Sequence, residues 1–173
     1  LKLHADEFRA TGGAELAGEL GAVSADHLMA VTDRGIRALK RSGTVAVLLP
    51  GTSHFLGGGR FAPARRMLEE GVPIALGTDF NPGSCTAFSL PLIMSLACTH
   101  LGMSPAQALS ASTINAAYAC GEGGEAGSLE PGKRADLVVW HARDVRELPY
   151  WLGANLVWKV IRGGRLEVER KSV

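Results

Sequence analysis

Four residues of this chain have side chains suited to metal or proton chemistry, and they lie at or just after the ends of apolar runs: His4, Glu7, His27 and Asp79. A neutral imidazole suits Zn²⁺ or Fe²⁺, and a nearby carboxylate that is not a ligand can carry protons. A carboxylate at the end of a buried strand needs a partner that offsets its desolvation, and a metal ion is such a partner. Polar residues at successive strand ends build the active site of a parallel α/β barrel. The pattern therefore predicts a metal-dependent hydrolase.

Each of these residues also has a purely structural interpretation. His4 and Glu7 could be a surface histidine beside an acidic patch, and His27 could be a structural histidine with satisfied hydrogen bonds. Asp79 could be the N-cap of a helix that begins near Pro82. We prefer the catalytic interpretation because all four residues occur at the same end of three of the predicted strands.

Strands and helices alternate four times over the first 80 residues. The predicted strands are 1–3, 22–25, 44–49 and 72–77, and the helices between them are 11–20, 34–41 and 63–70, with a flexible glycine-rich loop at 51–59. Short connections of this kind imply parallel strands joined by right-handed crossovers. Four units are half of an eight-unit barrel, which typically needs about 250 residues. We therefore expect an α/β fold that is half of a metal-dependent-hydrolase TIM-like (β/α)8 barrel: the C-terminal half of a longer enzyme, a half that pairs with a second copy, or a fragment.

The second part of the chain has a different pattern. Helices are predicted at 87–101 and 106–120, and strands at 135–140 and 156–161. A hairpin signal follows at Arg162-Gly163-Gly164-Arg165. We expect two units: residues 1–120, half of the barrel with trailing helices, and residues 121–173, part of a small β-sandwich element.

A half-barrel would leave strand edges and apolar faces uncovered. The side chains expected to lack a packing partner are Val45, Val47, Leu49, Ile74 and Leu76. The chain also lacks an initiator methionine, and a candidate ligand already stands at position 4. We expect either a homo-oligomer or a missing N-terminal half.

Composition excludes several classes of protein. With 173 residues, 46% of them hydrophobic and 20% charged, the chain is globular, and its formal net charge of +1 gives no reason to expect nucleic acid or an anionic membrane surface as a partner. Three cysteines without CxxC spacing suit reduced thiols, and no apolar run approaches the roughly 20 residues of a membrane span. We expect a cytoplasmic protein that acts on a small molecule.

Two other features of the sequence do not add to the predicted active site. His54, in the glycine-rich stretch, could touch substrate from a lid, but we interpret it as an ordinary loop histidine. The run from Gly127 to Lys133 matches a phosphate-binding loop, yet Arg134 follows where Ser or Thr is required, and a strand follows where a helix is required. Nucleotide binding is therefore not expected.

Several segments carry a resemblance to a known family: His4-Ala5-Asp6-Glu7, Ser24-Ala25-Asp26-His27, Leu49-Pro50-Gly51-Thr52 and Thr78-Asp79-Phe80-Asn81-Pro82-Gly83-Ser84. Together they resemble the second half of the imidazolonepropionases, histidine-degrading enzymes of the amidohydrolase superfamily. The later run from Gly127 to Leu137 is similar to the C-terminal β-element of that superfamily. The segment from Thr78 to Ser84 is the one most particular to imidazolonepropionases.

Carried over position by position, the resemblance makes His4 and Asp79 ligands of one Zn or Fe ion. It makes Glu7, His27 and Asp79 catalytic, with Glu7 as a proton carrier and His27 as an acid–base or substrate-orienting residue. The implied substrate contacts are Glu7, Asn81, Gly83 and Ser84. The remaining two metal ligands of the family come from a His-x-His on the first barrel strand, and this chain contains no His-x-His.

The reaction implied by the resemblance is hydrolysis of the ring amide of 4-imidazolone-5-propanoate to N-formimidoyl-L-glutamate, with the isolated chain inactive. One alternative is another amidohydrolase such as a guanine or cytosine deaminase, which should lack the continuation from Asn81 to Ser84. Another is a non-catalytic, truncated half-barrel that only folds or dimerises.

Overall fold

The computed structural model describes residues 1–170, which form two β-sheets. The strands are β1 (Lys2–Ala5), β2 (Ser24–His27), β3 (Val45–Leu48), β4 (Ile74–Leu76), β5 (Leu137–Trp140), β6 (Val157–Arg162) and β7 (Arg165–Glu169). The first four are parallel and lie in the order β1-β2-β3-β4, whereas β5-β6-β7 is antiparallel. The predicted α/β pattern of four parallel strands is confirmed.

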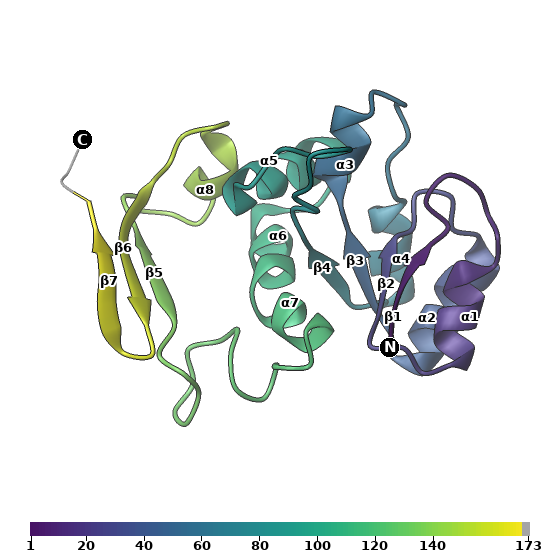
Figure 1. Ribbon diagram of the computed structural model, residues 1–173, viewed down its shortest axis with the longest axis horizontal. Helices are drawn as coiled ribbons and strands as arrows, with labels where there is room; N and C mark the ends of the chain where they lie inside the picture. The colour runs from purple at the N-terminus through teal and green to yellow at the C-terminus, as the bar shows by residue number, and fades with distance from the viewer. Residues whose placement is uncertain (171–173) are drawn as a thin grey trace.

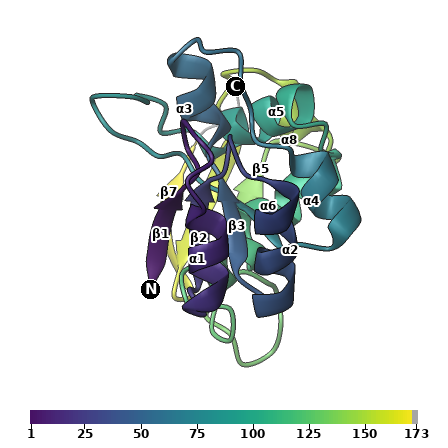
Figure 2. The same cartoon turned by 90° about the vertical axis from the view of Figure 1, so that its right-hand side faces the viewer.

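Helices connect the strands and separate the two sheets. They are α1 (Gly13–Glu19), α2 (Asp33–Ser42), α3 (Pro50–Phe55), α4 (Ala64–Glu70), α5 (Leu90–His100), α6 (Pro105–Ser112), α7 (Ile114–Ala119) and α8 (Glu147–Tyr150). Figure 1 shows the two sheets on opposite sides of α6 and α7, with α1 and α2 beyond the parallel sheet. Figure 2 shows α1 and α2 side by side on one face of the parallel sheet. The division into units 1–120 and 121–173 remains a prediction.

Local sequence explains where several elements begin and end. The Thr32 hydroxyl caps α2 by accepting the amide of Gly35, and α6 begins with a reciprocal capping box between Ser104 and Gln107. The predicted hairpin is confirmed between β6 and β7. Its two central residues, Gly163 and Gly164, both have positive φ (54° and 79°), which a tight hairpin turn of this kind requires.

One face of the parallel sheet carries the main core. In register across the strands lie Leu3, Ala25, Ala46 and Ile74, and Leu48 pairs with Leu76 one layer further on. All but Leu3 are buried, and they pack with apolar side chains of the flanking helices. This packing fixes the strand register, and the register in turn places the polar residues at the strand ends.

The expectation that five apolar side chains would lack packing partners is wrong for four of them. Val45, Leu49, Ile74 and Leu76 are all less than 10% exposed, and Val47 is half-buried. Helix α7 explains part of this burial, because its alanines pack on Val45, Val47 and Ala75 on the other face of the sheet.

Two predicted elements also differ from the structure. The helix expected at 106–120 breaks at Thr113 (φ −124°, ψ −95°), which lets α7 fold back onto the sheet. The side chain of Asn115 on α7 donates to the carbonyl of Ile74 (2.7 Å) at the edge of β4. The expected loop at 51–59 instead begins within α3, which contains His54; Pro50 starts this helix, and only the later part is irregular.

No helix in residues 1–170 is both long enough and apolar enough to cross a membrane.

Candidate active site

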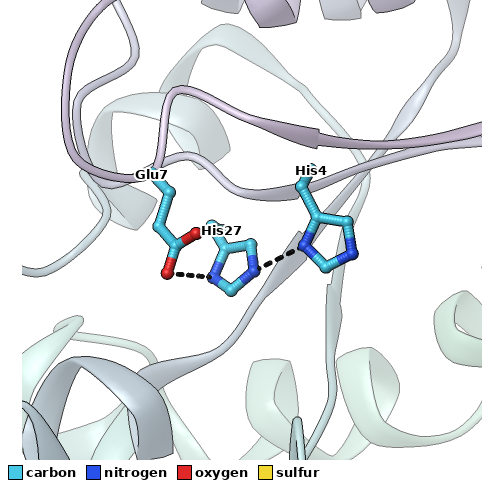
Figure 3. A group of neighbouring side chains, drawn as sticks. All are labelled: His4, Glu7 and His27. Carbon is cyan, nitrogen blue, oxygen red and sulfur yellow. Dashed lines mark hydrogen bonds and ion pairs between the residues drawn. The ribbon is translucent and has the colours of Figure 1, made fainter. Parts of the chain in front are cut away.

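The ends of β1 and β2 bring three predicted site residues together (Figure 3). Nδ1 of His4 lies 2.9 Å from Nε2 of His27, and Nδ1 of His27 lies 3.6 Å from a carboxylate oxygen of Glu7. The parallel register brings the two strand ends level, but it pairs His4 with Asp26, and regular strands would put His4 and His27 on opposite faces of the sheet. The positive φ of His27 (74°) breaks that alternation where the two rings meet. His27 is buried and Glu7 is half-buried, whereas His4 is exposed. The predicted convergence of His4, Glu7 and His27 is therefore present in the structure.

Unusual backbone geometry gathers at the same strand ends. Within residues 1–170, the non-glycine residues with positive φ are Asp6 (48°), His27 (74°), Leu28 (61°) and Asp79 (50°). Left-handed conformations are costly for residues with a Cβ, and those of this kind that persist are often found at active sites. All four lie at or just after the ends of strands of the parallel sheet. Their strained backbone supports the placement of a functional site at this edge of the sheet.

Asp6 lies between the candidate ligand and the candidate proton carrier in the sequence, and the residue is 4% exposed. Burial opposes its ionisation, but hydrogen bonds from backbone amides, led by that of Ala14, and from the Thr11 hydroxyl lower the pKa of Asp6 below the ordinary value of 3.8. Asp6 was not among the predicted site residues. The sequence feature that could have identified Asp6 is its position between His4 and Glu7.

The lowered pKa of Asp6 predicts acid sensitivity. A carboxyl group whose pKa is lower in the folded state stabilises the fold above its unfolded pKa, and that contribution is lost as the pH falls through the folded value. We expect the free energy of unfolding to decline as the pH is lowered through about 4 and below, measured by urea unfolding between about pH 3 and 6. The Asp6→Asn variant should show a shallower decline. An equal decline in the two proteins would contradict this expectation.

Asp79 lies at the same edge of the sheet but is not part of the group of three. It follows β4, two strands from β2, which corresponds to about 10 Å at ordinary strand spacing. Within residues 1–170, the compact group of possible metal-binding side chains contains His4, Glu7 and His27, without Asp79. The two predicted ligands, His4 and Asp79, thus lie at the same edge of the sheet but do not belong to one group of neighbouring side chains.

Thr52 holds Asp79 and was not predicted as a site residue. Its hydroxyl, fully buried in α3, donates to Oδ2 of Asp79 at 2.5 Å. The preceding Gly51 has no room for a Cβ, which would lie 2.8 Å from Ile93 and 2.9 Å from Cys85. The structural alternative for Asp79 is wrong, because the helix that follows it begins at Leu90 with Ser89 as its cap. The signal for Thr52 was its position just after β3.

The predicted substrate contacts after Asp79 form a tight polar turn. The side-chain oxygen of Asn81 accepts the backbone amides of Gly83 (2.9 Å) and Ser84 (2.8 Å). Its side-chain nitrogen donates to the carbonyl of Asp79 (2.7 Å) and to the Ser84 hydroxyl (3.0 Å). Asn81 therefore organises the segment directly after Asp79, and substrate contact by these residues remains a prediction.

A cavity of about 280 Å³ adjoins the group of three on the side of Glu7. Its lining is apolar with a few polar groups: Glu7, Phe8, Met29, Ser53, Leu56, Gly58 and Arg60. This mixture suits a small molecule that has an apolar body and a few polar atoms. A larger and mostly apolar cavity of about 600 Å³ lies between α5, α6 and β5, and none of the predicted site residues line it.

The donor set fits a divalent transition metal. One ligand atom from each of His4, Glu7 and His27 lies within 4.8 Å of the other two, and imidazole nitrogen with carboxylate oxygen is a donor set that Zn²⁺ accepts. Because Nδ1 of His4 faces His27, its Nε2 remains available as a ligand atom.

Comparison with known proteins defines the class of this chain. The model of the amidohydrolase family matches residues 4–166, and the chain therefore belongs to that family. Among curated relatives, it is 53% identical over 172 residues to an imidazolonepropionase of Geobacillus kaustophilus (strain HTA426), covering 99% of this chain and 40% of the relative. It is also 51% identical over 173 residues to an imidazolonepropionase of Symbiobacterium thermophilum, covering 100% and 41%. The chain spans about 40% of the length of these relatives.

Solved structures share the fold. An adenosine deaminase from Xanthomonas campestris with bound zinc superposes with a TM-score of 0.80 at 25% identity, covering 97% of this chain and 45% of that one. A 5-methylcytosine deaminase from Klebsiella pneumoniae gives a TM-score of 0.81 at 19% identity, covering 99% and 49%. The structure is thus part of an amidohydrolase-type barrel with its accompanying β-element, as the sequence predicted.

Proposed function

We propose that this chain is the part of an imidazolonepropionase that supplies the carboxyl ends of four barrel strands. The observation that carries the proposal is the identity of 53% with such an enzyme along almost the whole chain. The grouping of His4, Glu7 and His27 at one strand edge supports it. The proposed reaction adds water across the ring amide of 4-imidazolone-5-propanoate: hydroxide joins the carbonyl carbon, and the ring nitrogen leaves with a proton, giving N-formimidoyl-L-glutamate.

We assign His4 and Asp79 to hold one Zn or Fe ion, which when bound supplies a Lewis acid and acidifies a water molecule. The other steps belong to side chains of this chain. Glu7 accepts the proton of the attacking water or returns one to the leaving nitrogen, with Asp79 as the second carboxylate able to do so. With its proton on Nδ1, His27 turns this N–H toward the Glu7 carboxylate 3.6 Å away, and its Nε2 accepts from Nδ1 of His4. His27 thus orients Glu7 and links it to His4.

The turn at Asn81, Gly83 and Ser84 is proposed to contact the imidazolone or the ring-opened product. This assignment separates an imidazolonepropionase from the second candidate, a guanine- or cytosine-type deaminase. The likeness to solved deaminases supports that candidate at the level of fold. Substrate assays with imidazolone propanoate, guanine and cytosine side by side distinguish the two.

The direct test is a fusion protein in which the region of the Geobacillus kaustophilus relative that precedes the matched segment is joined in front of Leu1. We expect the metal-loaded fusion protein to hydrolyse imidazolone propanoate and to leave guanine and cytosine unchanged. A folded, metal-containing fusion protein that turns over guanine or cytosine instead, or no substrate at all, would refute the proposal.

The 173-residue chain alone is expected to be catalytically silent. It has no His-x-His, and losing part of a ligand set weakens metal binding by several kcal/mol, far more than losing one outer contact. The measurement is a turnover assay on purified chain with added Zn²⁺ or Fe²⁺, beside the fusion protein as positive control. Robust turnover by the chain, free of any longer form, would show that its own residues complete the site.

We also propose that β1 is covered by a second copy of the chain or by another segment of the longer enzyme. Within residues 1–170, β1 pairs only with β2, so its other edge has free backbone groups, and such edges are normally protected. Sedimentation equilibrium at micromolar concentration should give a dimer or larger species for the chain alone. A monomer with cooperative thermal unfolding would contradict this expectation.

We also propose that the enzyme is located in the cytoplasm, and its three free cysteines support this location.

A further inference from the structure

We propose that Asp6 is a positioning residue, whose buried carboxylate fixes the turn after β1 so that Glu7 faces His27. The consequence for catalysis rests on the function proposed above. The consequence for the geometry of the two histidines does not, and it can be measured in the chain alone.

The Asp6 carboxylate ties the end of β1 to the start of α1. One oxygen accepts the amide of Thr11 (2.8 Å), the Thr11 hydroxyl (3.2 Å) and the amide of Gly13 (3.1 Å). The other oxygen accepts the amide of Ala14 (3.0 Å). Residue Gly12, where a capping side chain would ordinarily stand, provides none, so the Asp6 carboxylate satisfies these amides in its place. Glu7 lies inside the turn that these bonds close.

The backbone on either side of Asp6 is bonded to the turn after β2. The carbonyl of Ala5 accepts the amide of Leu28 (3.0 Å), and the carbonyl of Asp6 accepts the amide of Ala30 (2.7 Å). The two donors, Leu28 and Ala30, come shortly after His27 in the chain. His27 and Leu28 both have positive φ. The segment that carries Glu7 and the segment that carries His27 are therefore locked together around Asp6.

Close packing leaves this turn little freedom to find another arrangement. A Cβ on Gly13 would lie 3.0 Å from both Cα and Cβ of Ala5, so the first residue of α1 sits directly against the end of β1. With φ of 48°, Asp6 itself adopts a conformation that most residues avoid, and its four accepted hydrogen bonds hold it there. Loss of the carboxylate should therefore release the turn, and Glu7 with it.

The experiment compares Asp6→Ala and Asp6→Asn with the parent chain. The ¹⁵N resonances of the His4 and His27 rings report their hydrogen bonds, and we expect those of His27 to move in Asp6→Ala toward the values of a Glu7→Gln variant. In the fusion protein, kcat should fall by about 100-fold with little change in KM, the size expected when a reacting group is displaced by about 1 Å. Asp6→Asn keeps the oxygen that accepts three of the bonds, so it should lie between the parent and Asp6→Ala.

Ser104→Ala is the matched control. It removes a cap of comparable kind, because the Ser104 hydroxyl accepts the Gln107 amide at the start of α6, a helix that packs on β4, α5 and α7, away from the turn after β1. It should lower the thermal midpoint without moving the histidine resonances or kcat.

If Asp6→Ala lowers only the thermal midpoint, as Ser104→Ala does, the carboxylate is a helix cap and the inference is overturned. If Asp6→Ala does not fold, Asp6→Asn decides: parent-like histidine resonances and kcat would overturn the inference, and intermediate values would support it. If the fusion protein itself is inactive, the proposed function fails, while the ring resonances of the chain still test Asp6.

Discussion

Replacing Glu7 with glutamine in the fusion protein is expected to lower kcat by about 10²- to 10⁴-fold, the usual contribution of a general acid or base. Glutamine keeps the size and shape of the side chain but cannot accept and return a proton, so the cavity beside it should remain intact. The oxygen that now lies 3.6 Å from Nδ1 of His27 also loses its charge. The fall should therefore appear in kcat and kcat/KM together, with KM nearly constant.

The measurement is steady-state hydrolysis of imidazolone propanoate by the variant and its parent at equal metal content. Glu69→Gln is a suitable control, because Glu69 is exposed on α4 and its nearest cationic partner is Arg65 at 3.9 Å. The control should match the parent. If Glu7→Gln retained full kcat, Glu7 would have no proton-carrying role, and Asp79 would become the sole candidate carboxylate.

The parallel sheet could be predicted because its determinants are local. Apolar runs of strand length, separated by helices that end at glycine, specify βα units, and the parallel arrangement follows from their short connections. Once β1 and β2 are neighbours, the register brings the carboxyl ends that carry His4 and His27 to the same level, but it pairs His4 with Asp26, so regular alternation would put His27 on the opposite face. The proximity of the two strand ends could thus be predicted, whereas the contact between the two rings depends on the positive φ of His27 (74°).

Contacts between distant segments could not be predicted in this way. Thr52 bonds to Asp79 because α3 begins directly after β3, and that beginning depends on Pro50 at the first helical position. The sequence around it, rich in glycine, favoured a loop. Likewise, the sequence around Thr113 contains no local signal for the break between α6 and α7. Because α7 was not expected to cover the sheet, the burial of Val45 was not predicted.

The role of Asp6 could not be predicted from the sequence for a different reason. Its neighbours have side chains with obvious chemistry, whereas its own carboxylate is used entirely in accepting hydrogen bonds from the protein. A sequence pattern records which residue types are present but not which of them face each other. The four accepted bonds become visible only when the turn between β1 and α1 is built.

Replacing Asp79 with asparagine is expected to remove most of the bound metal from the fusion protein and to abolish turnover. Asparagine tolerates the left-handed backbone that Asp79 adopts (φ 50°), so the substitution changes the charge of the group with little added strain. A neutral amide is a much poorer ligand than a carboxylate for Zn²⁺ or Fe²⁺, whose protein ligands are thiolate, imidazole and carboxylate. Metal analysis after dialysis, together with kcat, measures the effect.

The Thr52→Val variant tests the support of the proposed ligand Asp79. It removes the hydroxyl that donates to Asp79 and fills nearly the same buried space, so Asp79 keeps its charge but loses its orientation. Partners of this kind typically contribute 10- to 100-fold to metal affinity or activity, so the loss in Thr52→Val should be about that size and smaller than in Asp79→Asn. Full metal content in Asp79→Asn would remove Asp79 from the ligand set. The compact group of His4, Glu7 and His27 would then be left to hold the ion, with His27 as a ligand and no longer an acid–base residue.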